Sequence, residues 1–410
     1  MLGHPGQMLV DRLAGAGLAV YLVTGSWGLH RVTSLEPALW WEPRTWAVLG
    51  LAVLAFRPRM SAGLGVGVPE GRLLAAELVW LAGTLLTLAW APALELGVDA
   101  AIDLGLMSVA AISLYRLLQT GDARVLIDSF ERALLALLLL LLAAALAGGL
   151  GSGRLAALGG GPNVFGRNMG LLCVLSLDRA MRGASGGPDA SVRRVAWPIV
   201  AALAALLVAL SGSRGAMFAT SIALACLLAL GHARLGRRLI VVAGFSILGL
   251  CAVAFTELGA SVSESFATRV LDLFFREHYV SGRDRIYALA LERGFDAPLL
   301  GHGLNSFPAS TPWPYAHNIV LDAWFETGAF GVALLGLYFA TLGRGTLRAL
   351  ARERSGARWA GVDGLRAAAI LILVASQFSG GRYDARGLFG FAALSMVSFS
   401  RVLPPARRLR

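Results

Sequence analysis

Long apolar runs recur along the chain at short intervals, from residue 9 to residue 403. A run of about 17–25 apolar residues is long enough to cross the hydrocarbon core of a bilayer as a helix. The pattern therefore predicts an all-α polytopic membrane protein, a single transmembrane domain over residues 1–410 with about twelve spans. The predicted spans are 9–28, 38–56, 73–91, 97–118, 126–149, 162–178, 196–212, 215–231, 239–256, 318–342, 362–379 and 387–403.

Residues 257–316 form one sizeable polar stretch, which lies between the ninth and tenth predicted spans. Apolar side chains on one helical face predict an interfacial amphipathic helix over 263–275. A second helix is predicted from Ser281 to about Gly294, because Ser281 and Asp284 have the spacing of a capping box. Prolines and glycines then keep the chain irregular up to residue 316. We expect a large loop with short helices that covers one face of the bundle.

Composition and charge support a membrane protein with a defined orientation. Hydrophobic residues make up 57% of the chain, charged residues 15%, and the mean hydropathy is +0.68. These values exclude an ordinary soluble domain. The net charge of +11 comes mostly from arginines in short loops between apolar runs, so it does not indicate nucleic-acid binding. Cytoplasmic termini satisfy the positive-inside rule and place residues 257–316 on the outer face.

No metal or other cofactor is expected. The three cysteines, Cys173, Cys226 and Cys251, fall inside apolar runs without metal-ligand or disulfide spacing. The histidines of the outer loop also lack paired ligand spacing, and no acidic cluster resembles a divalent-ion site.

Several arginines lie on the predicted outer side, against the positive-inside bias. Each one alone is consistent with a side chain that snorkels to the membrane surface. Arginine is also the residue suited to gripping phosphate, because its planar fork donates paired hydrogen bonds. Arg167 lies inside an apolar span, where a charge costs about 2.5–3.5 kcal/mol. The set is Arg154, Arg167, Arg214, Arg269, Arg276, Arg283, Arg285, Arg293, Arg382 and Arg386.

His317 and Asn318 stand where the long polar stretch runs into the tenth span. A histidine at this boundary can accept a proton near neutral pH, and the asparagine can hold a substrate or orient the ring. The alternative is that His317 only anchors the helix. His302, in the segment GHGLNSF, is a second candidate base, but its glycine neighbours suggest a turn and it lacks a helix start.

Three segments carry a resemblance to a known family: SGSRGA at 211–216, SGRDRIYALALERGFDAPLLGHGLNSF at 281–307, and AHN at 316–318 followed by Gly331. Together they resemble the O-antigen ligase and polymerase superfamily over roughly residues 160–400. The resemblance implies an all-helical, type C glycosyltransferase-like fold. It also implies a donor glycan on undecaprenyl diphosphate and transfer to an acceptor hydroxyl at the periplasmic face of the bacterial inner membrane.

By position, His317 corresponds to the family's essential histidine, and Arg214 and Arg283 to its essential arginines. Tyr287 stands where many members have tryptophan, and Arg285 leaves open which arginine contacts the diphosphate. Asp322 and Glu326 are predicted to orient the imidazole or bind sugar hydroxyls; alternatively, Glu326 caps loop amides. The predicted substrate-binding residues are Arg167, Asn318, Glu326, Arg285, Arg382, Arg386, Tyr287 and Asp322.

The implied reaction is metal-independent and inverting, with His317 as the general base and the arginines neutralising the leaving diphosphate. A ligase would use a lipid A-core saccharide as acceptor, whereas a polymerase would extend a lipid-linked chain; the residues do not separate them. The partners expected are these lipid-linked substrates and membrane lipids, not nucleic acid. A transporter or lipid flippase is the non-enzyme alternative, because Glu77 and Asp103 lie deep in apolar runs.

Overall fold

The computed structural model describes residues 5–24, 42–57, 68–148, 155–158, 160–182, 190–230, 283–354 and 362–396. Every regular element in these ranges is a helix, so the predicted all-α class is confirmed. The elements are α1 (Pro5–Thr24), α2 (Pro43–Phe56), α3 (Val68–Leu86), η3 (Thr87–Trp90), α4 (Leu94–Thr120), α5 (Ala123–Ala147), α6 (Pro162–Arg182), α7 (Ala190–Leu210), α8 (Arg214–Leu230), α11 (Arg283–Gly294), α12 (Ser306–Ser310), α13 (Ile319–Arg354), α14 (Asp363–Ala375), η6 (Arg382–Ala385) and α15 (Arg386–Ser395).

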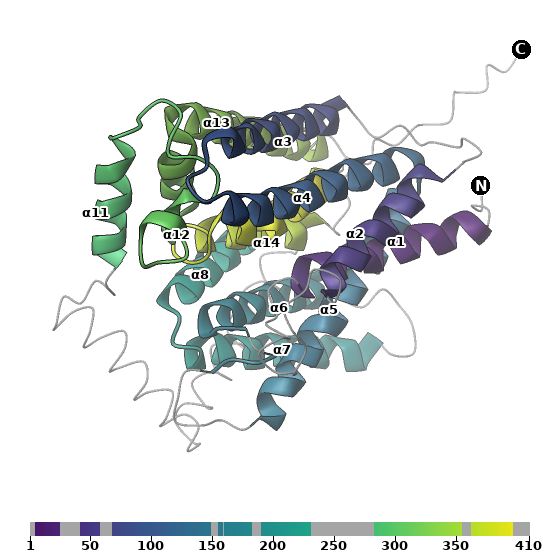
Figure 1. The fold of residues 1–410 in the computed structure, drawn as a ribbon. Coiled ribbons are helices and arrows are strands. Elements are labelled where there is room, and N and C mark those ends of the chain that lie inside the picture. Colours follow the sequence, from purple (N-terminus) through teal and green to yellow (C-terminus); the bar gives the residue numbers. More distant parts are fainter. Residues whose placement is uncertain are drawn as a thin grey trace, which may run out of the picture.

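The long helices pack side by side, and the short helices α11 and α12 lie at one end of the bundle, on the left in Figure 1. In this view α11 stands across the direction of α13 and α3. The most extensive helix pairs are α1 with α5, α6 with α7, α8 with α14, and α3 with α13. One continuous apolar core joins these pairs, whereas a small separate core holds α11 against the start of α13.

Four described helical stretches are long and apolar enough to cross a membrane: 71–90, 94–120, 123–147 and 319–351. The apolar helices at 43–56, 195–210 and 214–229 are shorter. Each of the remaining predicted spans also coincides with a helix, apart from 239–256, which lies outside the described residues. The predicted helix at 263–275 and the residues Arg154, Arg269 and Arg276 lie outside them as well. The chain has the helices of a multi-pass membrane protein, while the count of twelve spans stays a prediction. So does the assignment of 257–316 to one outer loop.

The tenth predicted span is interrupted, which the sequence analysis did not predict. At Gly328 the backbone of α13 leaves the helical region, with φ 60° and ψ −162°. This conformation is essentially restricted to glycine. Residues 319–327 therefore form a short helical segment, and a long helix continues from residue 329 to Arg354.

The loop that follows α11 fills this interruption. The amides of Ala329 and Phe330 donate to the carbonyls of Pro298 and Leu299, at 2.8 and 3.1 Å. On the other side of the break, the amides of His302 and Gly303 donate to the carbonyls of Phe325 and Glu326, at 2.9 and 3.0 Å. Backbone groups freed by the break are thus paired with the loop, so the loop and the start of α13 form one unit.

We predict that Gly328→Ala destabilises the protein, whereas Gly336→Ala in the same helix does not. A Cβ at position 328 would lie 2.5 Å from the carbonyl carbon of Leu299 and would need a positive φ, a strain of about 1–3 kcal/mol. A Cβ at position 336 meets no atom within 4 Å, and alanine there gains up to about 1 kcal/mol of helix propensity. Thermal unfolding of both variants in one detergent measures the difference. Equal melting temperatures would contradict the importance of the break.

Candidate active site

The turn that follows α14, residues 376–381, anchors the start of α13. The amide of Ile319 donates to the carbonyl of Ser376 at 3.0 Å. The Tyr287 hydroxyl of α11 donates to the carbonyl of Gln377 at 3.0 Å, and Asn318 Nδ2 reaches the same oxygen at 3.4 Å. The start of α13 and the helix α11 are thereby both fixed to this turn, next to His317.

His317 is held in an unusual backbone conformation. Its φ is 59°, in the left-handed region that side chains other than glycine rarely adopt. The neighbouring residues fix it there: the amide of Ala316 donates to Asp322 Oδ1 at 2.7 Å, and Asn318 Oδ1 accepts from the amides of Val320 and Leu321 at 2.9 and 3.1 Å. The side chains of Asn318 and Asp322 therefore position the His317 backbone.

The His317 imidazole is half-buried and neutral at pH 7. Its ring packs edge-on against Tyr315, with 4.5 Å between centroids, and its buried Nδ1 has no hydrogen-bond partner among the described residues. Burial lowers the pKa of His317 to about 4; the charge of Arg283 acts in the same direction, and Asp384 opposes it. A neutral ring can accept a proton from a bound hydroxyl.

Arg283, the first residue of α11, lies close enough to His317 for its charge to act on the imidazole. Burial lowers the pKa of Arg283, Tyr287 opposes this shift, and the charge of Arg214 adds to it. The two guanidinium groups are therefore close enough to repel one another. Arg285, two residues further along α11, is exposed. The geometry thus favours Arg283 over Arg285 as a group of this site.

Arg214 is carried by the SGSRGA segment at the start of α8. Ser213 Oγ accepts from the amide of Ala216 at 3.3 Å, as a helix cap does, and places Arg214 at the first position of the helix. Gly215 permits a close approach to the turn at 376–381, because a Cβ there would lie 2.7 Å from Phe378. Gly166 permits a similar approach of α6, since its Cβ would lie 2.5 Å from Ser211 Oγ. The starts of α6 and α8 therefore meet beside this turn.

Arg167 and Asp384 extend the site on the other side of Tyr315. Burial raises the pKa of Tyr315, and Asp384 and Asp322 raise it further, whereas Arg167 and Arg283 lower it, so these four residues lie near this phenol. Arg167 is buried, and its Nη1 has no hydrogen-bond partner among the described residues. Arg167, Asp384 and Arg386 line a small pocket, together with Asn168 and apolar side chains.

Arg382 and Glu326, two of the predicted binding residues, pair with each other. Both are buried, and they form an ion pair with each other. Glu326 Oε2 also accepts from the amide of Asn305 at 2.9 Å, which is the loop-capping alternative for this residue. The pair ties η6 to α13 and to the loop before α12.

His302, the second candidate base, is engaged elsewhere. Its Nε2 lies 2.8 Å from the carbonyl oxygen of Arg293, and its ring packs against Phe325 with 4.7 Å between centroids. These contacts hold the end of α11 against α13. The structure thus gives His302 a local structural role.

Sequence reasoning missed Asp384, Tyr315 and Gln377. Asp384 stands in the segment FSGGRYDAR, between Arg382 and Arg386. The prediction of a phosphate-binding site pointed to the arginines of this segment and not to its carboxylate. Tyr315 and Gln377 carry no pattern of their own. Their positions depend on how the turn at 376–381 meets the His317 segment, which is a tertiary contact.

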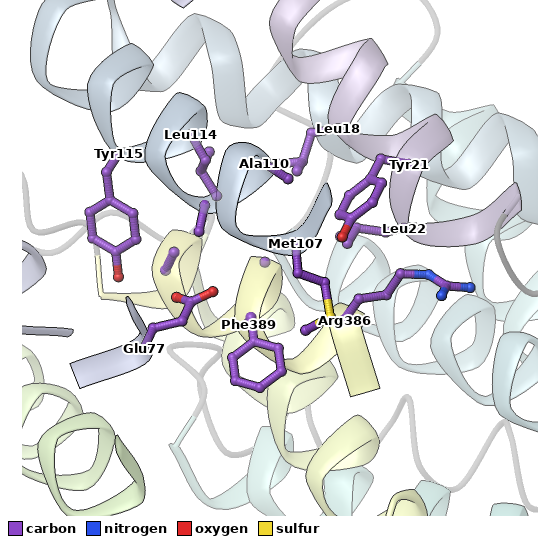
Figure 2. Close-up of a pocket in the computed structure, with 13 residues that line it drawn as sticks. Leu18, Tyr21, Leu22, Glu77, Met107, Ala110, Leu114, Tyr115, Arg386 and Phe389 are labelled. Atoms are coloured by element: carbon purple, nitrogen blue, oxygen red, sulfur yellow. The ribbon is translucent and has the colours of Figure 1, made fainter. Parts of the chain in front are cut away.

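A second small pocket shares Arg386 with the first and is shown in Figure 2. Its polar groups are Tyr21 and Arg386 at one side and Glu77 and Tyr115 at the other, with Met107 and Phe389 between them. A smaller neighbouring pocket contains an ion pair between Arg44 and Asp103, at 3.0 Å. Glu77 and Asp103, the two acidic residues deep in apolar runs of the sequence, therefore line small pockets that also contain Arg386.

Among the residues that the structure describes, no group of three or more His, Cys, Asp or Glu side chains is placed to hold a metal ion. The site is cationic: Arg283 of α11 lies near a neutral imidazole, Arg214 of α8 lies near Arg283, and Arg167 of α6 lies near Tyr315, with Asp384 and Asp322 as the nearby acidic residues. Such an arrangement can bind an anion and offers a base beside it.

Comparison with known proteins agrees with this chemistry. Residues 199–336 match a family model described as O-antigen ligase. The matched stretch contains Arg214, Arg283 and His317, whereas Arg167 and Asp384 lie outside it. No curated protein matches the chain. The match confirms the resemblance of this chain to the O-antigen ligase and polymerase superfamily, and it indicates a multi-pass membrane enzyme of the glycosyltransferase kind that acts on lipid-linked saccharides.

Proposed function

We propose that this protein is an inverting, metal-independent glycosyltransferase of the O-antigen ligase type. It moves a glycan from undecaprenyl diphosphate to a hydroxyl of a lipid A-core acceptor, at the periplasmic face of the bacterial inner membrane. The observation that carries the proposal is the neutral imidazole of His317 beside Arg283 of α11, with Arg214 of α8 close to Arg283.

His317 acts as the general base in this proposal. It takes the proton of the acceptor hydroxyl, whose oxygen attacks the anomeric carbon of the donor sugar. The bond from that carbon to the diphosphate oxygen breaks, and the configuration inverts because the displacement is single. The charge of Asp384, which favours a proton on His317, then stabilises the imidazolium that forms.

The arginines act on the leaving group. As the bond breaks, negative charge grows on the diphosphate, and preorganised donors at this point lower the barrier. Arg283 and Arg214 provide this charge near His317. The buried Arg167, with an unpartnered Nη1 at the adjacent pocket, provides a further donor for the diphosphate or for the first sugar.

The remaining predicted residues support the site from outside the reacting atoms. Asn318, Asp322 and Tyr287 fix the His317 backbone, and the Glu326–Arg382 pair fixes the loop and η6. Arg386 lines both small pockets beside the site. Arg285 takes no part because it is exposed.

The test is transfer by the purified protein in nanodiscs, with a chelator present throughout. We expect transfer from an undecaprenyl diphosphate glycan to a lipid A-core saccharide, no transfer by His317→Ala, and unchanged donor binding by that variant. A parallel reaction supplies a second lipid-linked glycan as acceptor; elongation of that acceptor alone identifies a polymerase. Normal transfer by folded His317→Ala refutes the role of the base, and a requirement for a divalent ion refutes metal independence.

The pH dependence of kcat/KM should reflect the lowered pKa of His317. The base is active when neutral, so activity is retained as the pH falls from 7 and is lost only near the pKa of about 4. The limb for kcat should lie higher, because a bound diphosphate favours the protonated ring. An acidic limb of kcat/KM near 6.5 would show that the ring titrates like an exposed histidine.

Arg283→Lys should impair transfer strongly, whereas Arg285→Lys should leave it near the wild-type rate. Lysine keeps the charge, but a point charge does not reproduce the paired hydrogen bonds of the guanidinium group to a phosphate. The two positions belong to the same helix and differ in exposure. Initial rates and donor affinity measured side by side test the assignment, and a larger defect at position 285 would reverse it.

A further inference from the structure

The loop between α11 and α12 ends in an apolar tip, Pro298–Leu300, whose side chains no described part of the protein covers. Leu299 is 71% exposed and Leu300 53% exposed, and Phe295 just before the tip is 63% exposed. Contiguous large apolar side chains on a surface mark a contact with a protein, a ligand or a membrane.

The tip is continuous with the lipid-facing side of α13. Beyond the break, exposed apolar residues follow one another at helical spacing: Phe330, Ala333, Leu337 and Ala340. In a membrane span this stripe faces lipid from Ala333 onward, while Phe330 lies at its border with α3. The carbonyl of Leu299 accepts the amide of Phe330 at 3.1 Å, so the tip begins where the stripe begins.

Contacts with α3 and η3 give the depth of the tip. Trp90, at the end of η3, donates its indole N–H to the carbonyl of Gly301 at 3.2 Å. An exposed tryptophan at a span end sits at the membrane–water interface. Gly83 lies about two helical turns inside Trp90 and packs against Phe330: a Cβ there would be 3.3 Å from the Phe330 ring. Leu299, whose carbonyl accepts from the amide of Phe330, therefore lies deeper in the membrane than Trp90.

Several backbone groups of the tip and of Gly301 after it are paired within the protein. Irregular backbone at membrane depth is tolerated only where its polar groups are paired. The carbonyl of Pro298 accepts from Ala329 at 2.8 Å, and the carbonyls of Leu299 and Gly301 accept from Phe330 and Trp90. The amide of Gly301 donates to Ala297 at 2.9 Å.

Charged residues precede the tip and are placed at its polar border. Glu292, Arg293 and Asp296 are exposed, and Arg293 Nη1 donates to the carbonyl of Ser310 at 3.0 Å, on the side of α12. In Figure 1, α11 stands across the ends of α13 and α3, as a helix at a membrane surface does. The sequence thus changes from polar to apolar over the few residues between α11 and the tip.

We propose that Leu299 and Leu300 insert into the acyl chains of the outer leaflet, and that this insertion holds α11 at the level of the lipid headgroups. The partner is the bilayer itself. For the site, the consequence is that Arg283 is kept at the depth where the phosphates of a membrane lipid lie. The insertion does not depend on which reaction the site performs.

The test places single cysteines in a background with Cys173, Cys226 and Cys251 replaced by alanine, and labels them with a fluorophore in nanodiscs. The test position is Leu299→Cys. Glu292→Cys on α11 is the aqueous control, and Leu337→Cys on the stripe of α13 is the lipid control. Quenching is measured with aqueous iodide and with lipids that carry a nitroxide near the top of the acyl chain.

We expect the label at position 299 to be quenched by the nitroxide lipid and to show several-fold less iodide quenching than the label at position 292. Iodide quenching at 299 equal to that at 292 would overturn the insertion. Because the readout is depth, it separates this inference from the proposed function: an inactive protein with a buried tip supports the insertion, and an active protein with an aqueous tip refutes it.

Discussion

The hydrogen bonds received by the turn at 376–381 are the constraint on which the site depends. Ser376 and Gln377 offer their carbonyls to Ile319 and Tyr287, so the start of α13 and the loop helix α11 are tied to one short segment. Gly215 lets α8 pack against the same turn at Phe378. Without these contacts the starts of α8 and α11, which carry Arg214 and Arg283, would have no common anchor beside the His317 segment.

The interruption of α13 at Gly328 has a matching role on the membrane side. It ends the short segment that carries Asp322 and Glu326, and it exposes amides that the loop after α11 pairs. The loop therefore becomes part of the helix bundle. Its apolar tip lies beside the lipid-facing stripe of α13, while α11, which precedes the loop, begins with Arg283 near His317. A single break in one helix thus links the reacting groups to the depth of the membrane surface.

Electrostatics at the site follows from burial of like charges around a neutral ring. Arg283 and Arg214 repel one another, and Arg283 disfavours a proton on His317. This arrangement is unfavourable when the site is empty, and a bound anion would relieve it. In the proposed reaction, the anionic donor would also make the imidazole a better proton acceptor. Asp384 would then balance the charge after proton transfer.

The sequence by itself determined the all-helical class and the membrane character, because hydropathy is a local property, and its motif spacing predicted the site residues that a family pattern carries. It also indicated Arg167, through the cost of a charge in an apolar run. Tertiary structure alone decided that Arg283 rather than Arg285 faces His317, that Glu326 pairs with Arg382, and that Asp384 and Tyr315 join the site. The break at Gly328 was also hidden, since a glycine in an apolar run reads as a helix unless a partner loop pairs the freed amides.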